Sequence, residues 1–488
     1  MVAGFPPQYA RKLNVQSGIR TYSPHHDTSN NTSIIISSEN VHILADELHH
    51  VYSSGGTDGV REWATIYFSK QQNLMDAATL MKTVTDTTKK IMIPNSATTS
   101  VAPGILNGLL GAVYDIQKYK RLSSSSEISN VTTGNIDELA LTMLTTKFDN
   151  KLTTNASSWP DLVAHCSVYS ILKGSHEERH QDQAELVLQK AEEYYPTKSK
   201  SKVPPALSSP TMLSPVQKEE LLNNHGIQVS LETNDYIVVS KPSGMVCYHD
   251  EMAINNARYV TKKKKRRSHG NGNDNDDSLE DILLQYVPLS TLNKVGRGFV
   301  HRIDRGTSGC ILLSKTNAMH AQLVTQFFLR RAKKSYLALV HAGGHFLDAN
   351  VKNGTWPNRG KVELAIRGKA ATSSYRVVQR YGESHVALLQ VETHQGRKHQ
   401  VRIHCSLGLQ SPILLDPLYG GEAIMFRTKR ESSNSILPKL HSQKRFCLHA
   451  QTLSIPDFGI DVEAPTPEWW QDVINEVKTE NKEVNPAG

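Results

Sequence analysis

The densest group of side chains able to do chemistry lies in the stretch 298–315, which reads G-F-V-H-R-I-D-R-G-T-S-G-C-I-L-L-S-K. The polar residues of its loop are His301, Arg302, Asp304, Arg305 and Thr307. An aspartate flanked by arginines stays ionised, because nearby positive charge favours the anion. Such a carboxylate can act as a nucleophile or as a base. The stretch therefore predicts a reactive Asp304, with a surface turn held by ion pairs as the alternative.

A second cluster occupies residues 393–404, T-H-Q-G-R-K-H-Q-V-R-I-H. Arg397 opens a short predicted helix over 398–407, and Arg402 follows about one and a half turns later. Guanidinium groups suit phosphate or carboxylate partners. The alternative is a basic helix face in solvent. His399 and His404 are five residues apart, which is not the spacing of paired helical metal ligands, so no metal site is expected.

The elements that must position these clusters form a predicted α+β domain. Short apolar strands are expected at 236–240, 310–313, 336–340, 373–378 and 387–391, and an amphipathic helix at 317–330. A further helix is expected to begin after Ser278 and to run through Tyr286, with Asp281 at the reciprocal capping position. Because strands and helices mix without regular alternation, we expect a mixed, mostly antiparallel sheet.

The chain before this domain has helical rather than strand-like periodicity. Apolar stripes predict helices within 60–82, 104–119 and 137–148, and a helical pair over 161–195. We therefore expect an all-α region of helical hairpins. The expected domain plan is a disordered N-terminus (1–40), the helical region (41–196), a Pro/Ser linker (197–217), the catalytic domain (218–475) with a basic insert (261–277), and a polar tail (476–488).

Composition limits the class of protein. A chain of 488 residues suggests two to four domains. Its net charge of +8 permits an anionic partner without naming one. No apolar run reaches the roughly 18 residues that a membrane-spanning helix needs, so no membrane partner is expected. Five scattered cysteines without a C-x-x-C pair favour a reducing compartment over a disulfide framework or a structural zinc site.

The compartment itself stays open among cytoplasm, nucleus and an organelle. Residues 1–26 carry three basic residues and no acidic residue, a composition that weakly resembles that of an organelle transit peptide. The six consecutive bases from Lys262 to Arg267 fit a solvated loop, a contact with RNA phosphate or a nuclear-localisation signal.

The order of the motifs is more specific than any one of them. They run K-P-S-G (241–244), H-R-I-D-R-G-T-S-G-C-I-L-L-S-K (301–315), K-K-S-Y-L-A-L-V (333–340), G-R-K-H-Q-V-R-I-H (396–404), L-D-P-L-Y-G (415–420) and L-H-A (448–450). This series resembles the RluA-type pseudouridine synthases over about residues 226–460. The resemblance implies the pseudouridine synthase fold and the isomerisation of specific uridines in RNA by base flipping.

The resemblance also implies roles for the matching positions. Asp304 matches the catalytic aspartate, Arg402 its cationic partner, and Tyr336 the ring that stacks on the uracil. Arg302 matches the residue that fills the gap left by the flipped base. The remaining expected substrate contacts are His301, Arg305, Thr307, Arg397, His399 and Gln400. The implied partner is an RNA: tRNA, rRNA or mRNA. The resemblance implies no cofactor, and we expect a monomer.

Three features leave alternatives open. The family often has glycine where Leu415 precedes the aspartate of L-D-P-L-Y-G, so this loop is expected to sit differently. Residues 160–195 look like one pentatricopeptide-type helical pair, which would bind single-stranded RNA; a generic helical domain is the alternative. For the catalytic domain, the alternatives are a non-catalytic RNA-binding protein with the same fold and an aspartate-dependent glycosidase. The glycosidase would need a second carboxylate beside Asp304.

Overall fold

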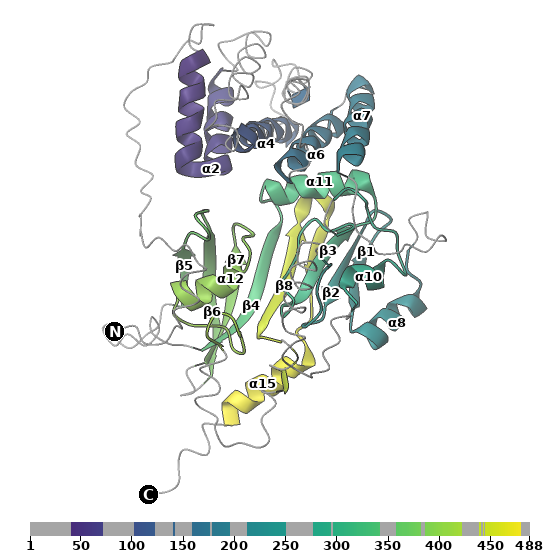
Figure 1. The fold of residues 1–488 in the computed structure, drawn as a ribbon, viewed down its shortest axis with the longest axis vertical. Helices are drawn as coiled ribbons and strands as arrows, with labels where there is room; N and C mark the ends of the chain where they lie inside the picture. The colour runs from purple at the N-terminus through teal and green to yellow at the C-terminus, as the bar shows by residue number, and fades with distance from the viewer. Residues whose placement is uncertain are drawn as a thin grey trace, which may run out of the picture.

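Helices pack together in the N-terminal part of the chain in the computed structural model (Figure 1). The structure describes residues 41–71, 102–122, 140–141, 159–175, 178–195, 212–249, 277–293, 296–341, 358–381, 386–421, 439–440, 443 and 445–479. The helices described in this part are α2 (Val41–Gln71), α4 (Ala102–Leu122), α6 (Trp159–Lys173) and α7 (Glu178–Tyr194). Along the chain, α2 packs on α4, α4 on α6, and α6 on α7.

These helices confirm the predicted helical periodicity. The stripe predicted at 104–119 lies in α4, and the pair predicted over 161–195 is α6 and α7. The segment 60–71 belongs to α2, which bends at Gly56, where φ is 62°. Glycine adopts such a conformation without the steric cost that a side chain adds. The rest of the predicted helices, 72–82 and most of 137–148, lies outside the described residues.

The second part of the chain is built on one nine-stranded sheet, as far as the structure describes it. The strands are β1 (Gln228–Glu232), β2 (Tyr236–Lys241), β3 (Ser308–Ser314), β4 (Lys333–His341), β5 (Arg359–Glu363), β6 (Thr372–Tyr381), β7 (Val386–Thr393), β8 (Leu448–Ile455) and β9 (Ile460–Glu463). The order is β1-β2-β3-β8-β4-β7-β6-β5, and β9 pairs with β8. Only the β3–β8 pair is parallel among these neighbours. The mixed, mostly antiparallel sheet is therefore confirmed.

The parallel pair depends on a glycine that directly follows the aspartate loop. Gly309 has φ 110° and pairs with Ala450 of β8. A Cβ atom on Gly309 would lie 2.1 Å from the Ala450 carbonyl oxygen, so no other residue fits. This close approach brings the end of the loop that carries Asp304 to the centre of the sheet.

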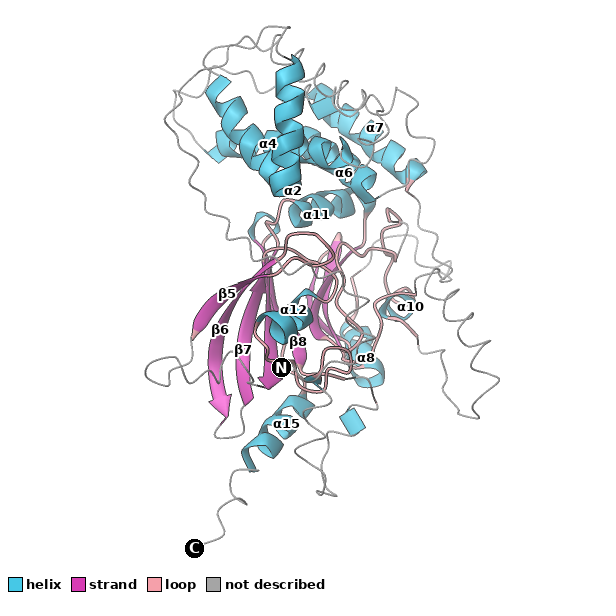
Figure 2. Ribbon diagram, turned by 60° about the vertical axis from the view of Figure 1, so that its left-hand side comes forward, coloured by secondary structure: helices cyan, strands magenta, loops and turns pink. Residues whose placement is uncertain are grey.

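Helices around the sheet complete the domain. They are α8 (Pro215–His225), α10 (Leu279–Leu283), α11 (Asn317–Phe328), α12 (Gln400–Ile403), which continues as a π-helical turn (His404–Gly408), and α15 (Glu468–Thr479). Figure 2 shows α11 between the N-terminal helices and the sheet, and α12 against the sheet. The predicted helix at 317–330 and the reciprocal cap between Ser278 and Asp281 are confirmed.

The two parts of the chain share one hydrophobic core. Apolar side chains of α4 and α6 pack in the same cluster as those of α11 and the sheet. Polar contacts support this packing: Ser170 Oγ donates to Thr325 Oγ1 over 3.0 Å, and Arg61 donates to the carbonyl of Leu329 over 2.8 Å. Arg331 also pairs with Asp115 over 2.9 Å. The helical region is therefore fixed on the catalytic domain through α11.

Several predicted boundaries differ from the structure. Helix α8 begins at Pro215, inside the predicted linker, because Ser214 and Gln217 form a capping box there. Helix α15 runs to Thr479, into the predicted tail. The helix predicted over 398–407 begins only at Gln400 and changes to π geometry at His404, and the helix after Ser278 ends at Leu283 rather than Tyr286.

Some predictions cannot be compared with the structure. The segment 1–40, the insert up to residue 276, the first part of the linker and the last residues of the tail lie outside the described residues. All five cysteines are described, and each is a free, buried thiol. Within the described ranges, no helix combines the length and the apolar composition that crossing a bilayer requires.

Candidate active site

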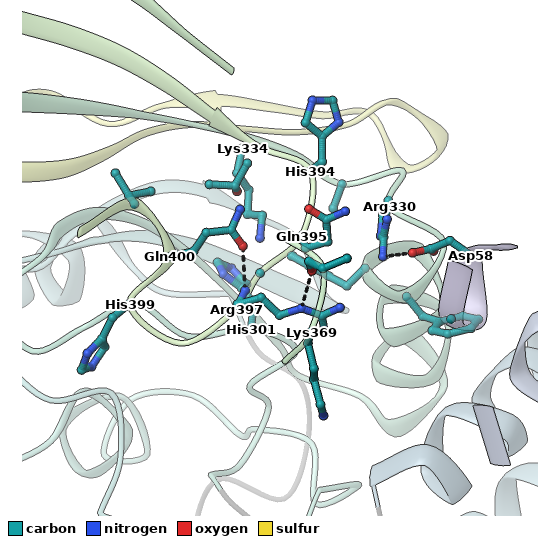
Figure 3. Close-up of a pocket in the computed structure, with 18 of the residues that line it drawn as sticks. Asp58, His301, Arg330, Lys334, Lys369, His394, Gln395, Arg397, His399 and Gln400 are labelled. Atoms are coloured by element: carbon teal, nitrogen blue, oxygen red, sulfur yellow. Dashed lines mark hydrogen bonds and ion pairs between the residues drawn. The ribbon is translucent and has the colours of Figure 1, made fainter. Parts of the chain in front are cut away.

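A cavity of about 760 Å³ opens between the sheet and the N-terminal helices (Figure 3). Cavities of roughly 300–1,000 Å³ are typical of ligand sites. Every predicted site residue except Arg305 lines this cavity. The lining also includes residues 53–58 of α2. The two clusters that are almost a hundred residues apart in sequence therefore meet in one place.

The K-P-S-G turn holds the loop that carries the aspartate. The buried Lys241 ammonium donates to the carbonyls of Pro242 and Met245, each over 2.8 Å, and to that of Arg305 over 3.2 Å. Ser243 Oγ donates to the Gly306 carbonyl over 2.5 Å. Arg305 Nε donates back to the carbonyl of this turn over 2.7 Å. Arg305 thus positions the loop from outside the cavity.

Asp304 faces a guanidinium that is itself held by a second carboxylate. Arg402 Nη1 donates to Asp304 Oδ2 over 3.0 Å. On its other edge, Arg402 donates from Nε and Nη2 to the two oxygens of Asp416, over 2.7 and 2.9 Å. The backbone N–H groups of Leu418 and Tyr419 also donate to Asp416 Oδ1. A fork–fork pair of this kind fixes the guanidinium plane and aims its remaining nitrogen at Asp304.

Charge and burial reinforce this arrangement. Burial acts to lower the pKa of Arg402, but hydrogen bonding and attraction from Asp416, with a smaller contribution from Asp304, raise that pKa above its ordinary value. Its guanidinium carbon also lies 4.4 Å from the ring centre of Phe446 and 5.0 Å from that of Tyr419. A cation over an aromatic face gains further attraction. The result is a permanent positive charge beside an aspartate whose side chain keeps 19% of its surface exposed.

Leu415 places Asp416 through an unusual backbone conformation. Its φ is 64°, in the left-handed region that glycine favours, and its side chain is fully buried. This explains the departure from the family pattern at this position. The left-handed conformation costs a non-glycine residue about 1–2 kcal/mol, whereas burying a leucine side chain stabilises a protein by about 2–5 kcal/mol relative to alanine. The packing gain exceeds the backbone cost.

A glycine at position 415 is therefore expected to destabilise the protein. Leu415→Gly should lower the free energy of unfolding by about 2–4 kcal/mol, because the lost packing outweighs the relieved backbone. Gln410 gives a matched control, since it is also left-handed (φ 51°) but exposed. Gln410→Gly should change stability little. Denaturant unfolding of both variants measures the difference, and a stabilised Leu415→Gly variant would contradict the account.

Tyr336 lies on β4, between Val391 of β7 and Ala450 of β8 in register. Burial, followed by the charge of Asp304, raises the pKa of its phenol above the ordinary value. Arg302, at the exposed side of the loop, donates from Nη1 to the Tyr248 hydroxyl over 3.0 Å and lies over the Tyr248 ring at 5.5 Å. Arg302 is thus held next to the cavity by an aromatic side chain from the segment after β2.

The histidines of the cavity have structural partners. His301 Nε2 accepts from the Leu312 N–H over 2.9 Å, and its ring stacks on Phe327 with centres 4.7 Å apart. Burial lowers the pKa of His301 to about 3, so this ring is neutral. His399 Nδ1 lies 2.8 Å from the Tyr419 hydroxyl, and its Nε2 lies 3.7 Å from Asp304 Oδ1. Burial lowers the pKa of His399 more than Asp304 raises it.

Two further predicted residues stabilise the loops around the cavity. Gln400 is buried, donates to the Thr372 carbonyl over 3.0 Å and accepts from the Arg397 N–H over 3.0 Å. Thr307 is buried, and its backbone N–H donates to the Asp304 carbonyl over 3.0 Å, which closes the turn after the aspartate. Gln400 therefore orients Arg397, and Thr307 shapes the aspartate turn.

Sequence reasoning missed the partner of Arg402. Asp416 lies in L-D-P-L-Y-G (415–420), a motif in which no site residue is predicted from the sequence. Its zero exposure and paired arginine give it a direct part in the site. The signal available in sequence was an aspartate followed by proline and tyrosine in an otherwise apolar run. His449 of the motif L-H-A is a buried core histidine that lies within hydrogen-bond distance of Ser308 Oγ and the Ala464 carbonyl.

Comparison with known proteins identifies the family of this chain. A family described as RNA pseudouridylate synthase matches residues 235–407. The ribosomal large subunit pseudouridine synthase D of Pseudomonas aeruginosa is 30% identical over 264 residues, which are 52% of this chain and 72% of that protein. The protein of the same name from Xanthomonas campestris is 34% identical and covers 38% of this chain and 56% of its own length. The chain belongs to the RluA-type RNA pseudouridine synthases.

The chain is accordingly an isomerase that converts uridine in RNA to pseudouridine. Among solved structures, human RNA pseudouridylate synthase domain containing 4 is 20% identical, with a TM-score of 0.34, and the match covers 51% of this chain and 92% of that one. Human RNA pseudouridylate synthase domain containing 1 is 19% identical, with a TM-score of 0.32, and covers 52% and 88%.

Proposed function

We propose that Asp304 is the nucleophile of this isomerisation and that Arg402 holds its carboxylate in position. The distance of 3.0 Å between Arg402 Nη1 and Asp304 Oδ2, inside a cavity that Tyr336 also lines, carries the proposal. A carboxylate held by a guanidinium is presented in one orientation, as a nucleophile requires. Asp416 acts on Asp304 indirectly, because it fixes the guanidinium between the two carboxylates.

The reaction moves one glycosidic bond and needs no redox partner. Asp304 attacks the target nucleoside, and the bond between uracil N1 and ribose C1′ breaks. The uracil turns, a bond forms between C5 and C1′, and the bond that joined Asp304 to the nucleoside breaks, which regenerates the carboxylate. The C5 proton leaves to solvent, and N1 takes up a proton. The isomer therefore has the same atoms as the substrate.

A base within paired RNA must leave its stack before Asp304 can reach it, at a cost of roughly a few kcal/mol. We infer that Tyr336 and Arg302 offset this cost. Stacking on an aromatic ring contributes about 1–3 kcal/mol per base, and Tyr336 offers that ring. Arg302 lies on the solvent-exposed side of the loop. From there its guanidinium can leave Tyr248 and enter the gap that the flipped base leaves in the RNA stack.

We further propose that the substrate is ribosomal RNA of the large subunit and that one chain acts alone. The bacterial relatives are named for the large ribosomal subunit. Transfer RNA and messenger RNA are the alternatives. Light scattering on the purified protein tests the monomer.

Mapping of carbodiimide-reactive pseudouridines tests the RNA class. Unmodified ribosomal, transfer and messenger RNA are each incubated with the wild-type protein and mapped. New sites are expected in the large-subunit ribosomal RNA, because this is the RNA that the relatives are named for. Modification confined to transfer or messenger RNA would contradict the ribosomal assignment but leave the isomerase chemistry in place.

A further inference from the structure

The cavity has an excess of positive side chains that the isomerisation does not use. Six Lys and Arg side chains line it, against only two carboxylates, Asp58 and Asp304. Arg402 pairs with Asp304, and Arg302 lies on Tyr248. The other cations are Arg330, Lys334, Lys369 and Arg397, and Figure 3 labels all four among the lining residues.

Three of these four cations have no acidic partner among the residues that the structure describes. In the part of the chain that the structure describes, no carboxylate lies within ion-pair distance of Lys334, Lys369 or Arg397. Burial lowers the pKa of Lys334 to about 8. Burial also lowers the pKa of Arg397, and the charge of Arg330 lowers it further. Cations that repel one another in a half-buried cavity are expected where an anion binds.

The loops hold Arg397 in place. Its Nε donates to the Ala370 carbonyl over 3.1 Å, and its backbone N–H donates to Gln400 Oε1 over 3.0 Å. Lys369 precedes that same Ala370, so the two cations come from loops that are tied together. Arg330 follows α11 in a left-handed conformation, with φ 56°. The loops before β6 and α12 and the end of α11 thus supply the cations.

The acid that faces Arg330 comes from the N-terminal helices. Asp58 forms an ion pair with Arg330, and Figure 3 shows the two side chains pointing toward each other. The bend of α2 at Gly56 lets residues 53–58 line the cavity. The position is fixed because Arg61, one turn further along α2, donates to the carbonyl of Leu329 over 2.8 Å. The helical region therefore reaches the same cavity as Asp304.

We propose that Arg330, Lys369 and Arg397 form a binding site for a backbone phosphate of the RNA strand that carries the target uridine, and that Asp58 occupies Arg330 when that phosphate is absent. The inference rests on the proposed function, since it places this strand in the cavity of Asp304. A phosphodiester offers the bidentate oxygens that guanidinium groups match. On binding, the phosphate displaces Asp58 from Arg330. The helical region therefore competes with the RNA for Arg330 and lowers the affinity for RNA.

The salt dependence of RNA binding tests this site. The affinity of the full-length protein for a fluorescein-labelled oligouridylate is measured by fluorescence anisotropy over a series of KCl concentrations. Arg330→Gln and Arg397→Gln should each weaken binding roughly tenfold at low salt. Each should reduce the slope of log affinity against log salt by about 0.7, the value for one phosphate contact on a single strand.

Asp58→Asn should act in the opposite direction. Removing the competing charge is expected to tighten RNA binding by up to about fivefold, the range of an exposed ion pair. Lys190→Gln and Asp182→Asn are the matched controls, because both residues are exposed on α7. Thermal unfolding shows that each variant is folded. The proposal would be overturned if Arg330→Gln had the same salt slope as the control Lys190→Gln. It would also be overturned if Asp58→Asn bound RNA more weakly than the control Asp182→Asn.

Failure of this site and failure of the catalytic proposal give different results. The slope of log affinity against log salt does not depend on turnover. Isomerisation by the wild-type protein, in turn, does not depend on which side chains supply its affinity for RNA. If the Arg330→Gln and Arg397→Gln variants have reduced salt slopes but turnover survives the loss of Asp304, only the catalytic role of Asp304 is refuted. Unchanged slopes, in a protein whose turnover requires Asp304, would refute only the phosphate site.

Discussion

Asp304→Asn is expected to abolish pseudouridine formation at every site that the wild-type protein modifies. Asparagine keeps the size of the side chain but removes the charge and the nucleophilic oxygen. Loss of a nucleophile typically lowers turnover by about 10³-fold or more. RNA affinity should stay within about threefold, because Asp304 contributes no cation to the phosphate contacts that dominate binding.

The measurement compares carbodiimide maps of RNA modified by the two proteins, with RNA affinity determined in parallel. Asp461→Asn is the matched control, since Asp461 is an exposed carboxylate on β9, outside the cavity. It should modify the same sites as the wild type. Loss of affinity together with loss of modification would mean that Asp304 serves mainly to hold the RNA.

Asp416→Asn should destabilise the protein as well as slow it. Arg402 and Asp416 are both buried, and removing one partner of a buried ion pair costs about 3–5 kcal/mol. Turnover of the folded fraction should also fall, because the guanidinium loses the fork that aims Nη1 at Asp304. Denaturant unfolding and tritium release from RNA that contains [5-³H]uridine measure the two effects.

A double variant separates stability from catalysis at this pair. Arg402→Met with Asp416→Leu replaces both charges with apolar groups, a change that is often neutral or stabilising for buried pairs. We expect most of the stability to return while tritium release stays absent, because Asp304 then lacks its cation. Recovery of turnover in the double variant would show that Arg402 has only a structural part.

Much of the catalytic domain was predictable because its signals are local. Strand β2 is a short apolar run that ends in K-P-S-G, and α11 has both an apolar stripe and a capping threonine at residue 316. The weaker elements were missed for a physical reason. Strand β1 is mostly solvent-accessible on both faces, and β9 has only four residues, so neither has a strong apolar pattern.

The site was predictable in part. Asp304 and Arg402 lie in dense polar motifs, and the resemblance to the RluA-type family implies that the two side chains pair. The partner of Arg402 was not found, because pairing with Asp416 depends on a left-handed turn at Leu415 that no local pattern announces. The contact between Asp58 and Arg330 depends on how α2 docks beside α11, which is a tertiary property.

Single-turnover tritium release, with enzyme in excess over RNA containing [5-³H]uridine, tests the central claim most directly. The C5 hydrogen leaves only when C5 bonds to the ribose, and excess enzyme removes product release from the measured rate. The wild-type protein should release one tritium per modified site, and Asp304→Asn should release none above background. Release by Asp304→Asn at the wild-type rate would contradict the assignment of Asp304 as the nucleophile.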